Sequence, residues 1–178
     1  MTHPDLRTPR LSLRAIGRSD RDFLLKHFSD PVVNEFLFDA EPLGSLKEAD
    51  GLIDFYLAGA ANHNHRYIMR DERDMPIGTV GFHCYDPERR SIDLGYDLEP
   101  GYFRRGYATE AVGAVLAYLR GALPLERIEA CIYPDNAASV AVVKKFNFYE
   151  DRRVTLRFRG VDYVHAVYAA PVPERREA

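Results

Sequence analysis

Alternation of apolar and polar positions predicts strands in both halves of the chain. In residues 10–16 and 127–133 every second position is apolar or small. A two-residue period of this kind places the apolar side chains on one face of a strand. Further strands are predicted at residues 66–70, 76–85 and 91–98, and residues 155–170 are predicted to form a hairpin that turns near Gly160.

Other segments follow the 3.6-residue period of a helix. From Thr109 to about Arg120, apolar side chains recur at i, i+3, i+4 and i+7, namely Val112, Val115, Leu116 and Leu119. Three more helices are predicted. One begins at Ser19 or Asp20, one spans roughly residues 45–60, and one begins near the polar Asp135 and Asn136.

This order of elements predicts an α/β (α+β) fold. We expect a mixed, mostly antiparallel sheet of about seven strands flanked by about four helices. Two strand–helix–strand steps in the middle require parallel or splayed neighbours, and ligands tend to bind at such strand ends. We expect one domain over residues 8–170, and a frayed tail over residues 171–178, which contain two prolines and several charges.

Composition narrows the possible functions. A formal net charge of −3 argues against a partner such as nucleic acid that is bound through bulk positive charge. Cys84 and Cys131 form no disulfide framework, and no apolar run is long enough to span a membrane. The first residues have no apolar signal-peptide core, so we expect a cytoplasmic protein. The histidines show no metal-ligand spacing, and His63 and His65 would need other ligands, so we expect no metal.

The segment GYFRRGYATEA, residues 101–111, carries the clearest functional signal. It lies between a predicted strand and a predicted helix and contains Arg104, Arg105 and Gly106. The first turn of a helix has free N–H groups and partial positive charge, so this loop is suited to hold a phosphate-like anion. A solvated basic turn is the alternative. The P-loop pattern and the three-glycine Rossmann pattern are absent.

Three segments, in this order, resemble the GNAT N-acetyltransferase superfamily: TPRLSLRAI, DLGYDLEPGYFRRGYATEAV and RIEACIYPDNAASVAVVKKFNF. The loop is similar to the family's pyrophosphate loop, Q/R-x-x-G-x-G/A, with Gly106 and Ala108 at the small positions. Phe103 departs from the usual first residue. An aromatic residue there is common in the subgroup that acetylates ribosomal-protein N-termini, which the other segments also resemble. The resemblance covers residues 8–170 and implies a GNAT-type fold with acetyl-CoA as cosubstrate.

The resemblance also implies which residues bind the cosubstrate. Backbone N–H groups of the loop would surround the pyrophosphate, and backbone groups of the preceding strand would line the CoA arm and polarise the thioester carbonyl. Asn136 would hydrogen-bond the pantetheine, although it also fits a plain helix N-cap. The implied binding residues are Tyr96, Asp97, Leu98, Arg104, Arg105, Gly106, Tyr107, Ala108, Thr109, Asn136 and Ser139.

Two side chains are candidates for catalysis. Ser139 would lie near the sulfur and donate to the departing thiolate, because the tyrosine that many members place seven residues after the asparagine is Val143 here. An ordinary first-turn helix serine is the alternative. Asp93 would accept the amine proton directly or through water. It could instead face solvent or pair with Arg89 or Arg90.

The expected function is acetyl transfer from acetyl-CoA to a primary amine, by direct attack in a ternary complex. A protein N-terminus, a small amine and an aminoglycoside remain open as acceptors, and both a monomer and a homodimer remain open as the oligomeric state. Tyr85, Tyr102 and Tyr133 are candidates to line the acceptor pocket. We expect neither nucleic acid nor membrane as a partner. The rival interpretation is a non-catalytic acyl-CoA-binding module on the same fold.

Overall fold

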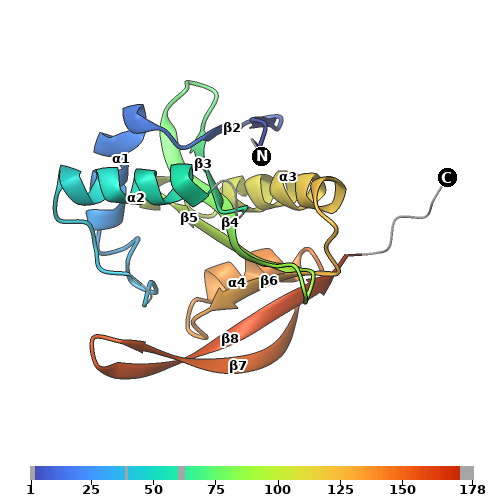
Figure 1. The fold of residues 1–178 in the computed structure, drawn as a ribbon. Coiled ribbons are helices and arrows are strands. Elements are labelled where there is room, and N and C mark those ends of the chain that lie inside the picture. Colours follow the sequence, from blue (N-terminus) through green and yellow to red (C-terminus); the bar gives the residue numbers. More distant parts are fainter. Residues whose placement is uncertain (1–2, 39, 60–62, 173–178) are drawn as a thin grey trace.

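The computed structural model describes residues 3–38, 40–59 and 63–172. Its strands form one sheet in the order β1-β2-β3-β4-β5-β6-β8-β7, in which β5 and β6 are parallel and the other neighbours are antiparallel (Figure 1). The strands are β1 (Leu6–Arg7), β2 (Ser12–Ala15), β3 (His65–Arg70), β4 (Pro76–Asp86), β5 (Ser91–Leu98), β6 (Arg127–Ile132), β7 (Tyr149–Phe158) and β8 (Val161–Pro171).

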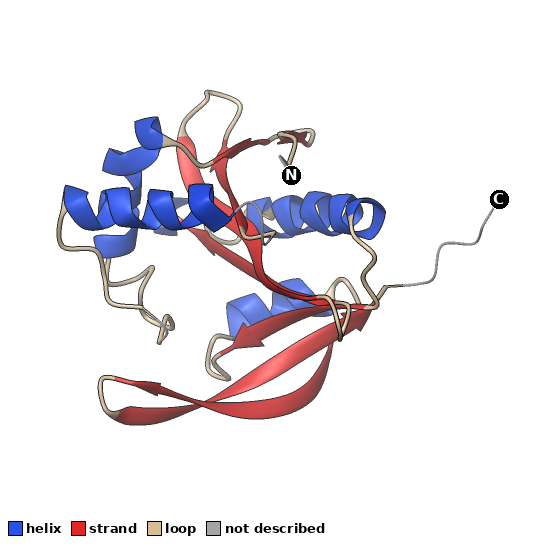
Figure 2. Ribbon diagram, viewed as in Figure 1, coloured by secondary structure: helices blue, strands red, loops and turns tan. Residues whose placement is uncertain are grey.

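Four α-helices accompany the sheet in the described part of the chain (Figure 2). They are α1 (Arg21–Ser29), α2 (Leu46–Ala58), α3 (Tyr107–Ala122) and α4 (Ala137–Lys144), with short 3-10 helices at Arg18–Asp20 and Pro100–Tyr102. The predicted α/β class, with a mostly antiparallel sheet, is therefore confirmed. The sheet has eight strands rather than about seven, because the two-residue β1 is too short to leave a periodic signal.

Some predicted boundaries were wrong. Strand β7 begins at Tyr149, earlier than predicted, because its first residues are charged and exposed and so give no apolar alternation. The predicted start of α1 is confirmed, because Asp20 is its N-cap residue, although the Asp20 carboxylate accepts from the Gly17 N–H and from Arg70 rather than from the helix. Strand β8 extends to Pro171, and the rest of the predicted tail, residues 173–178, lies outside the described residues. The single-domain boundary of 8–170 stays a prediction.

Strand β3 shows how the helices are distributed over the sheet. Tyr67 and Met69 belong to the core cluster that contains α3, whereas Ile68 belongs to the cluster that contains α1 and α2. Because successive strand residues point to opposite faces, α3 covers one face of this part of the sheet and α1 with α2 covers the other. All three of these β3 side chains are fully buried.

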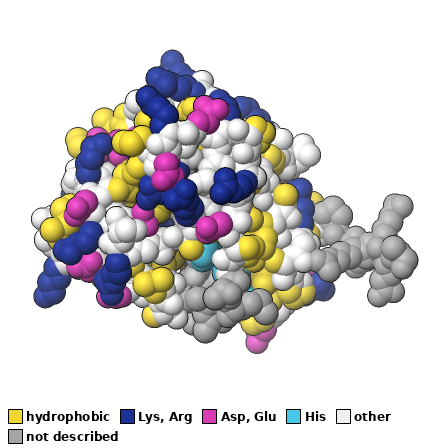
Figure 3. All heavy atoms as spheres, turned by 90° about the horizontal axis from the view of Figure 1, so that it is seen from above, with side chains coloured by type: hydrophobic (Ala, Val, Ile, Leu, Met, Phe, Trp, Pro, Cys, Tyr) yellow, Lys and Arg dark blue, Asp and Glu magenta, His cyan; other side chains and the backbone are white. Residues whose placement is uncertain are grey.

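The surface around α1 and α2 carries charges of both signs. Figure 3 shows basic and acidic side chains interspersed on this face of the molecule. Several of them form ion pairs, such as Arg21 with Asp50 and Arg14 with Asp74. None of the helices among the described residues combines the length and the apolar character needed to cross a membrane.

The middle of the sheet opens between β5 and β6. Within the described residues these strands pair at three positions, Ser91 with Arg127, Ile92 with Ile128 and Asp93 with Glu129. Beyond Asp93 the strands diverge, and β6 continues its pairing with β8 on its other side. The backbone edges of residues 94–97 and 130–132 therefore face a wedge rather than each other.

A buried ionic network fixes β5 on one side of this wedge. His27 of α1 is fully buried, with Nε2 2.6 Å from Asp97 Oδ1 and Nδ1 3.0 Å from Glu99 Oε1. Arg66 donates to the other Asp97 oxygen at 2.9 Å. Burial alone would lower the pKa of His27, but its hydrogen bonds to the two carboxylates outweigh this and raise the pKa above its usual value. We infer that both ring nitrogens carry protons.

The network predicts a pH-dependent contribution to stability. Replacing His27 by Gln should lower the free energy of unfolding by about 3–5 kcal/mol near pH 6, because it removes the buried cation that Asp97 and Glu99 share. Since the folded-state pKa of His27 is raised, its contribution is complete below the ordinary value of 6.5 and is lost as the pH rises through the folded-state value. Urea unfolding between pH 5.5 and pH 9 measures this loss.

Lys26→Gln is the matched control. Lys26 also contacts Glu99, but its side chain is 75% exposed. Its replacement should therefore lower the free energy of unfolding by only about 0–1 kcal/mol. A His27→Gln deficit that stays constant from pH 5.5 to pH 9 would show that the imidazolium does not stabilise the fold.

Candidate active site

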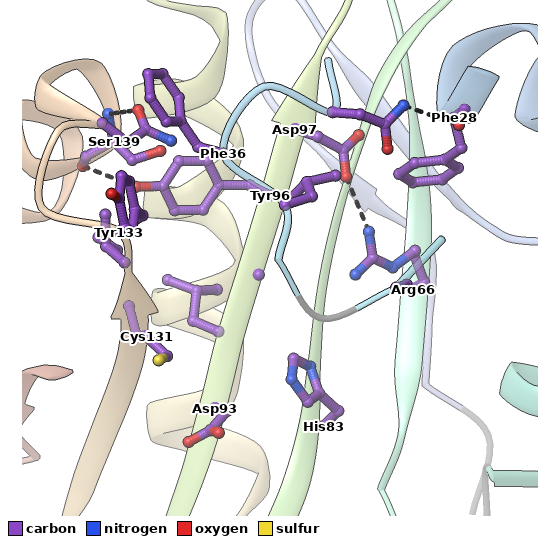
Figure 4. A pocket seen from close by; sticks show the side chains of 18 of the residues that line it. Phe28, Phe36, Arg66, His83, Asp93, Tyr96, Asp97, Cys131, Tyr133 and Ser139 are labelled. Carbon is purple, nitrogen blue, oxygen red and sulfur yellow. Dashed lines mark hydrogen bonds and ion pairs between the residues drawn. The ribbon is translucent and has the colours of Figure 1, made fainter. Parts of the chain in front are cut away.

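The wedge between β5 and β6 leads into a cavity of about 280 Å³ (Figure 4). One wall is residues 93–97 of β5, and the other consists of residues 130–133 with the start of α4. The segment between α1 and α2 covers the cavity. Its lining from that side is mainly apolar and aromatic: Phe28, Phe36, Leu37, Leu43, Leu52 and Tyr56.

The first turn of α4 presents Ser139 to this cavity. Asn136 is the N-cap, and its side-chain oxygen accepts from the Ser139 N–H at 3.0 Å. On the opposite side the Tyr96 hydroxyl donates to the Ser139 carbonyl at 2.9 Å (Figure 4). Burial raises the pKa of Tyr96 above its usual value, so this hydroxyl keeps its proton. The Ser139 backbone is therefore held from both sides, and the predicted N-cap role of Asn136 is confirmed.

Asp93 lies deeper on β5, in the last residue pair before the strands diverge. Burial raises the pKa of its carboxyl group to about 6, and the neighbouring Glu129 adds to this, while Arg152 and Arg89 act in the opposite direction. The arginines proposed from sequence as its partners are engaged elsewhere: Arg90 with Glu126 at 2.7 Å, and Arg89 with Glu129 at 3.5 Å. Asp93 is thus a half-buried carboxyl group on the cavity wall with a pKa suited to proton transfer.

The glycine loop lies at the start of α3. Gly106 is the helix N-cap at φ +83°, a left-handed conformation that favours glycine, and Arg104 is also left-handed at φ +60°. Within the described part of the chain no side chain caps this helix end. The first-turn N–H groups from Tyr107 onward are therefore available to an anion, and the exposed Arg104 and Arg105 add positive charge beside them.

Contacts from distant segments hold this loop in place, and the sequence analysis missed them. Arg10 forms an ion pair with Glu110 at 2.7 Å, donates to the Arg105 carbonyl at 3.0 Å and covers the Tyr107 ring at 4.4 Å. Lys145, just after α4, reaches Thr109 at 3.3 Å. Arg10 and Glu110 are 100 positions apart, so no local pattern could have paired them.

The other predicted site residues do not all line the cavity. Tyr96 and Asp97 line the cavity, but the Asp97 carboxylate is occupied by His27, Arg66 and Thr79. Leu98 belongs to the hydrophobic core rather than the cavity wall. Val143 is fully buried in the same core. Ala108 and Thr109 lie in the first turn of α3, which begins at Tyr107, two residues before the predicted start at Thr109.

Of the three tyrosines predicted to line the acceptor pocket, Tyr133 lies on the cavity wall. The prediction was wrong for Tyr85 and Tyr102. The Tyr85 ring packs on His63, and Tyr102 packs beside Tyr107 near the glycine loop. Composition alone could not show which of these tyrosines lines the cavity, because the position of each ring depends on the strand or turn that carries it.

Aromatic contacts join the cavity cover to the β7–β8 hairpin. Phe38 stacks on Tyr163 with ring centroids 4.2 Å apart and also contacts Tyr133 at 4.8 Å. Glu41 forms an ion pair with Arg159 at the hairpin turn. The segment after α1, which lines the cavity, therefore packs against the hairpin.

Sequence comparison identifies relatives of this chain. Residues 10–149 match the family model described as an acetyltransferase (GNAT) domain. A Bacillus licheniformis protein named as the uncharacterized N-acetyltransferase p20 is 34% identical over 150 residues, which are 82% of this chain and 83% of the relative. Bacillus subtilis YoaA, also named as an uncharacterized N-acetyltransferase, is 31% identical over 96% of this chain and 98% of its own length.

Solved structures share the fold. RimL, a ribosomal-protein alpha-N-acetyltransferase in complex with coenzyme A, has a TM-score of 0.83 at 17% identity, over 95% of this chain and 98% of its own. A spermidine N-acetyltransferase from Vibrio cholerae, in complex with CoA and spermine, has a TM-score of 0.80 at 21% identity, over 93% of this chain and 97% of its own. These likenesses support the fold and do not select the ribosomal-protein subgroup. The matched model, the curated relatives and the architecture agree, and the chain belongs to the GNAT family of acetyltransferases.

Proposed function

We propose that this protein transfers the acetyl group of acetyl-CoA to a primary amine by direct attack in a ternary complex. The observation that carries the proposal is the opening between β5 and β6, which leads into a cavity lined by the N-cap and the first turn of α4. Asn136 and Ser139 of α4 line this cavity, and the glycine loop caps α3. The family relationship makes acetyl-CoA the expected cosubstrate.

In this proposal the cosubstrate follows the wedge. The pyrophosphate binds the backbone N–H groups of residues 104–109, with Lys145 and the loop arginines as additional cations. The pantetheine lies along the backbone of residues 96–98, and the Asn136 amide nitrogen donates to it while its oxygen caps the helix. A strand N–H of β5 polarises the thioester carbonyl as charge develops on its oxygen.

In this proposal two side chains assist the reaction, one as a base and one as a hydrogen-bond donor. The acceptor amine must be neutral to attack the thioester, and Asp93 accepts its proton directly or through one water molecule. The thiolate that leaves is stabilised by the Ser139 hydroxyl, since Val143 has no proton to donate. Asp93 and Ser139 both line the same cavity, which a shared reaction centre requires.

The acceptor is a small amine or a protein N-terminus that fits under the aromatic cover. The single experiment that tests the function is turnover of acetyl-CoA with a panel of amines, including a polyamine and an N-terminal peptide of a ribosomal protein. Acetylation of any panel member supports the proposal. Tight CoA binding without turnover on every amine would favour the non-catalytic acyl-CoA-binding module. The cytoplasmic location, the oligomeric state and the absence of a nucleic-acid or membrane partner stay predictions.

The first prediction concerns the glycine loop. Gly106→Val should weaken acetyl-CoA binding by about 1–3 kcal/mol, because valine resists the left-handed backbone that this cap needs. Gly160→Val is the matched control, since Gly160 has φ +77° but lies at the turn of the β7–β8 hairpin. Calorimetric titration with CoA measures both variants. Unchanged affinity in folded Gly106→Val would remove the loop from the binding site.

The second prediction concerns the leaving thiolate. Ser139→Ala keeps the backbone N–H that Asn136 caps, so the helix should stay intact while kcat falls about 100-fold. CoA affinity should change little. Tyr96→Phe serves as the comparison, because its hydroxyl contacts the same turn through the Ser139 carbonyl. If Ser139→Ala retains the wild-type kcat and Tyr96→Phe loses it, Tyr96 rather than Ser139 is the donor.

The third prediction concerns the base. Lysine-like amines have a reference pKa of about 10.4, and α-amino groups have one of about 7.7–8.0, so more of the α-amino acceptor is already neutral at pH 7.5. Asp93→Asn should therefore reduce kcat/KM more on the strongly basic acceptor than on the weakly basic one. Steady-state kinetics with both acceptors on metal-free protein measures the difference. Equal losses would show that Asp93 is structural.

A further inference from the structure

Strand β4 contains a bulge beside the cavity. His83 pairs with Asp93, but the next pair is Asp86 with Ser91, so β4 has one more residue than β5 across this step. Cys84 within the bulge has φ +53°, a left-handed conformation that is uncommon for residues other than glycine. The Cys84 N–H donates to the Asn64 side chain at 3.2 Å, which supports this conformation.

The bulge changes which way neighbouring side chains point. In a regular strand, His83 and Cys84 would point to opposite faces of the sheet. Here an imidazole nitrogen of His83, the Cys84 sulfur and a carboxylate oxygen of Asp93 all lie within 4.8 Å of one another. Figure 4 shows His83 and Asp93 on the adjacent strands β4 and β5. We propose that these three residues bind a zinc-like divalent cation, at a site distinct from the CoA-binding residues.

The donor set suits such a cation. Cysteine sulfur, imidazole nitrogen and carboxylate oxygen are the three ligand types that Zn²⁺ takes in proteins. Ligands of a tetrahedral zinc ion lie roughly 3.5 Å apart, as follows from bond lengths of about 2.0–2.3 Å. Movements of about an ångström would therefore bring the three donor atoms into place. Cys84 is exposed, so the cation can enter from solvent, and three protein ligands leave a fourth position open.

The local charges determine how strongly the cation is held. Asp93 lies directly beside Glu129 in the β5–β6 register, and a cation reduces the repulsion between the two carboxylates. The positive charges of Arg89 and Arg152 disfavour a cation beside Asp93. Both arginines, however, form ion pairs with Glu129. A thiolate and an imidazole favour zinc-like ions over Mg²⁺ and Ca²⁺, which prefer oxygen ligands. The site therefore selects by ligand type rather than by charge alone.

Occupation of the site has a consequence for the reaction. A cation bound to the Asp93 carboxylate would prevent it from accepting the amine proton, so Zn²⁺ should inhibit acetyl transfer reversibly. This consequence rests on the proposed function. Binding of the cation does not, because it involves β4 and β5 alone and needs neither acetyl-CoA nor an acceptor.

Titration of the metal-free, reduced full chain with Co²⁺ tests the binding. Cobalt occupies tetrahedral zinc sites and, unlike zinc, gives visible absorption bands together with a thiolate-to-cobalt charge-transfer band. We expect both in the wild type, with displacement by Zn²⁺ and not by Mg²⁺. Cys84→Ala should lose the charge-transfer band. His83→Gln and Asp93→Asn should weaken binding by more than the roughly 10–100-fold that loss of an outer-shell partner costs.

Cys131→Ala is the matched control, because Cys131 is also exposed and lies on the cavity wall with His83 and Asp93. It should retain the full cobalt spectrum. A wild type without a thiolate band, or a band that survives in Cys84→Ala and disappears in Cys131→Ala, would overturn the proposal. Circular dichroism of each variant checks that it is folded. The spectrum decides the question even if no amine is acetylated, so failure of this site and failure of the proposed function are distinguishable.

Discussion

The site depends on one constraint, the short parallel pairing of β5 with β6. Three residue pairs hold the strands together, and beyond Asp93 they separate. Separation is possible because each strand keeps an antiparallel partner on its other side, β4 for β5 and β8 for β6. Backbone N–H and C=O groups need partners, so the divergent edges are suited to pair with an extended ligand rather than with each other. The cavity and the exposed turn of α4 both follow from this divergence.

Charged networks keep the walls of the wedge in position. On one side, His27 and Arg66 bind the Asp97 carboxylate and link β5 to α1 and β3. At the start of α3, Arg10 and Glu110 link the glycine loop to the amino-terminal strands. Hydrogen bonds between charged groups are directional, so they fix orientation in a way that apolar contacts alone do not. Both networks lie next to backbone that we assign to CoA binding.

The two roles that we propose for Asp93, a base for the amine and a ligand for a cation, compete with each other. Partial burial raises the pKa of Asp93, and the same wall places it beside the donor atoms of His83 and Cys84. A base for an amine and a ligand for a cation both need a carboxylate whose lone pairs are accessible. The bulge in β4 makes the second role possible, because it turns Cys84 toward the residue that His83 already faces.

The sequence by itself determined the features that local patterns encode. These are the strand and helix periods, the glycine at the start of α3, the Asn136 cap and the resemblance to the family. The tertiary structure decided the Arg10–Glu110 pair, the burial of His27 between Asp97 and Glu99, and the convergence of His83, Cys84 and Asp93. Periodicity reports which face of an element is buried, but not which distant residue meets it. A one-residue bulge reverses the direction of a side chain without leaving any periodic signal, and so only the folded chain reveals it.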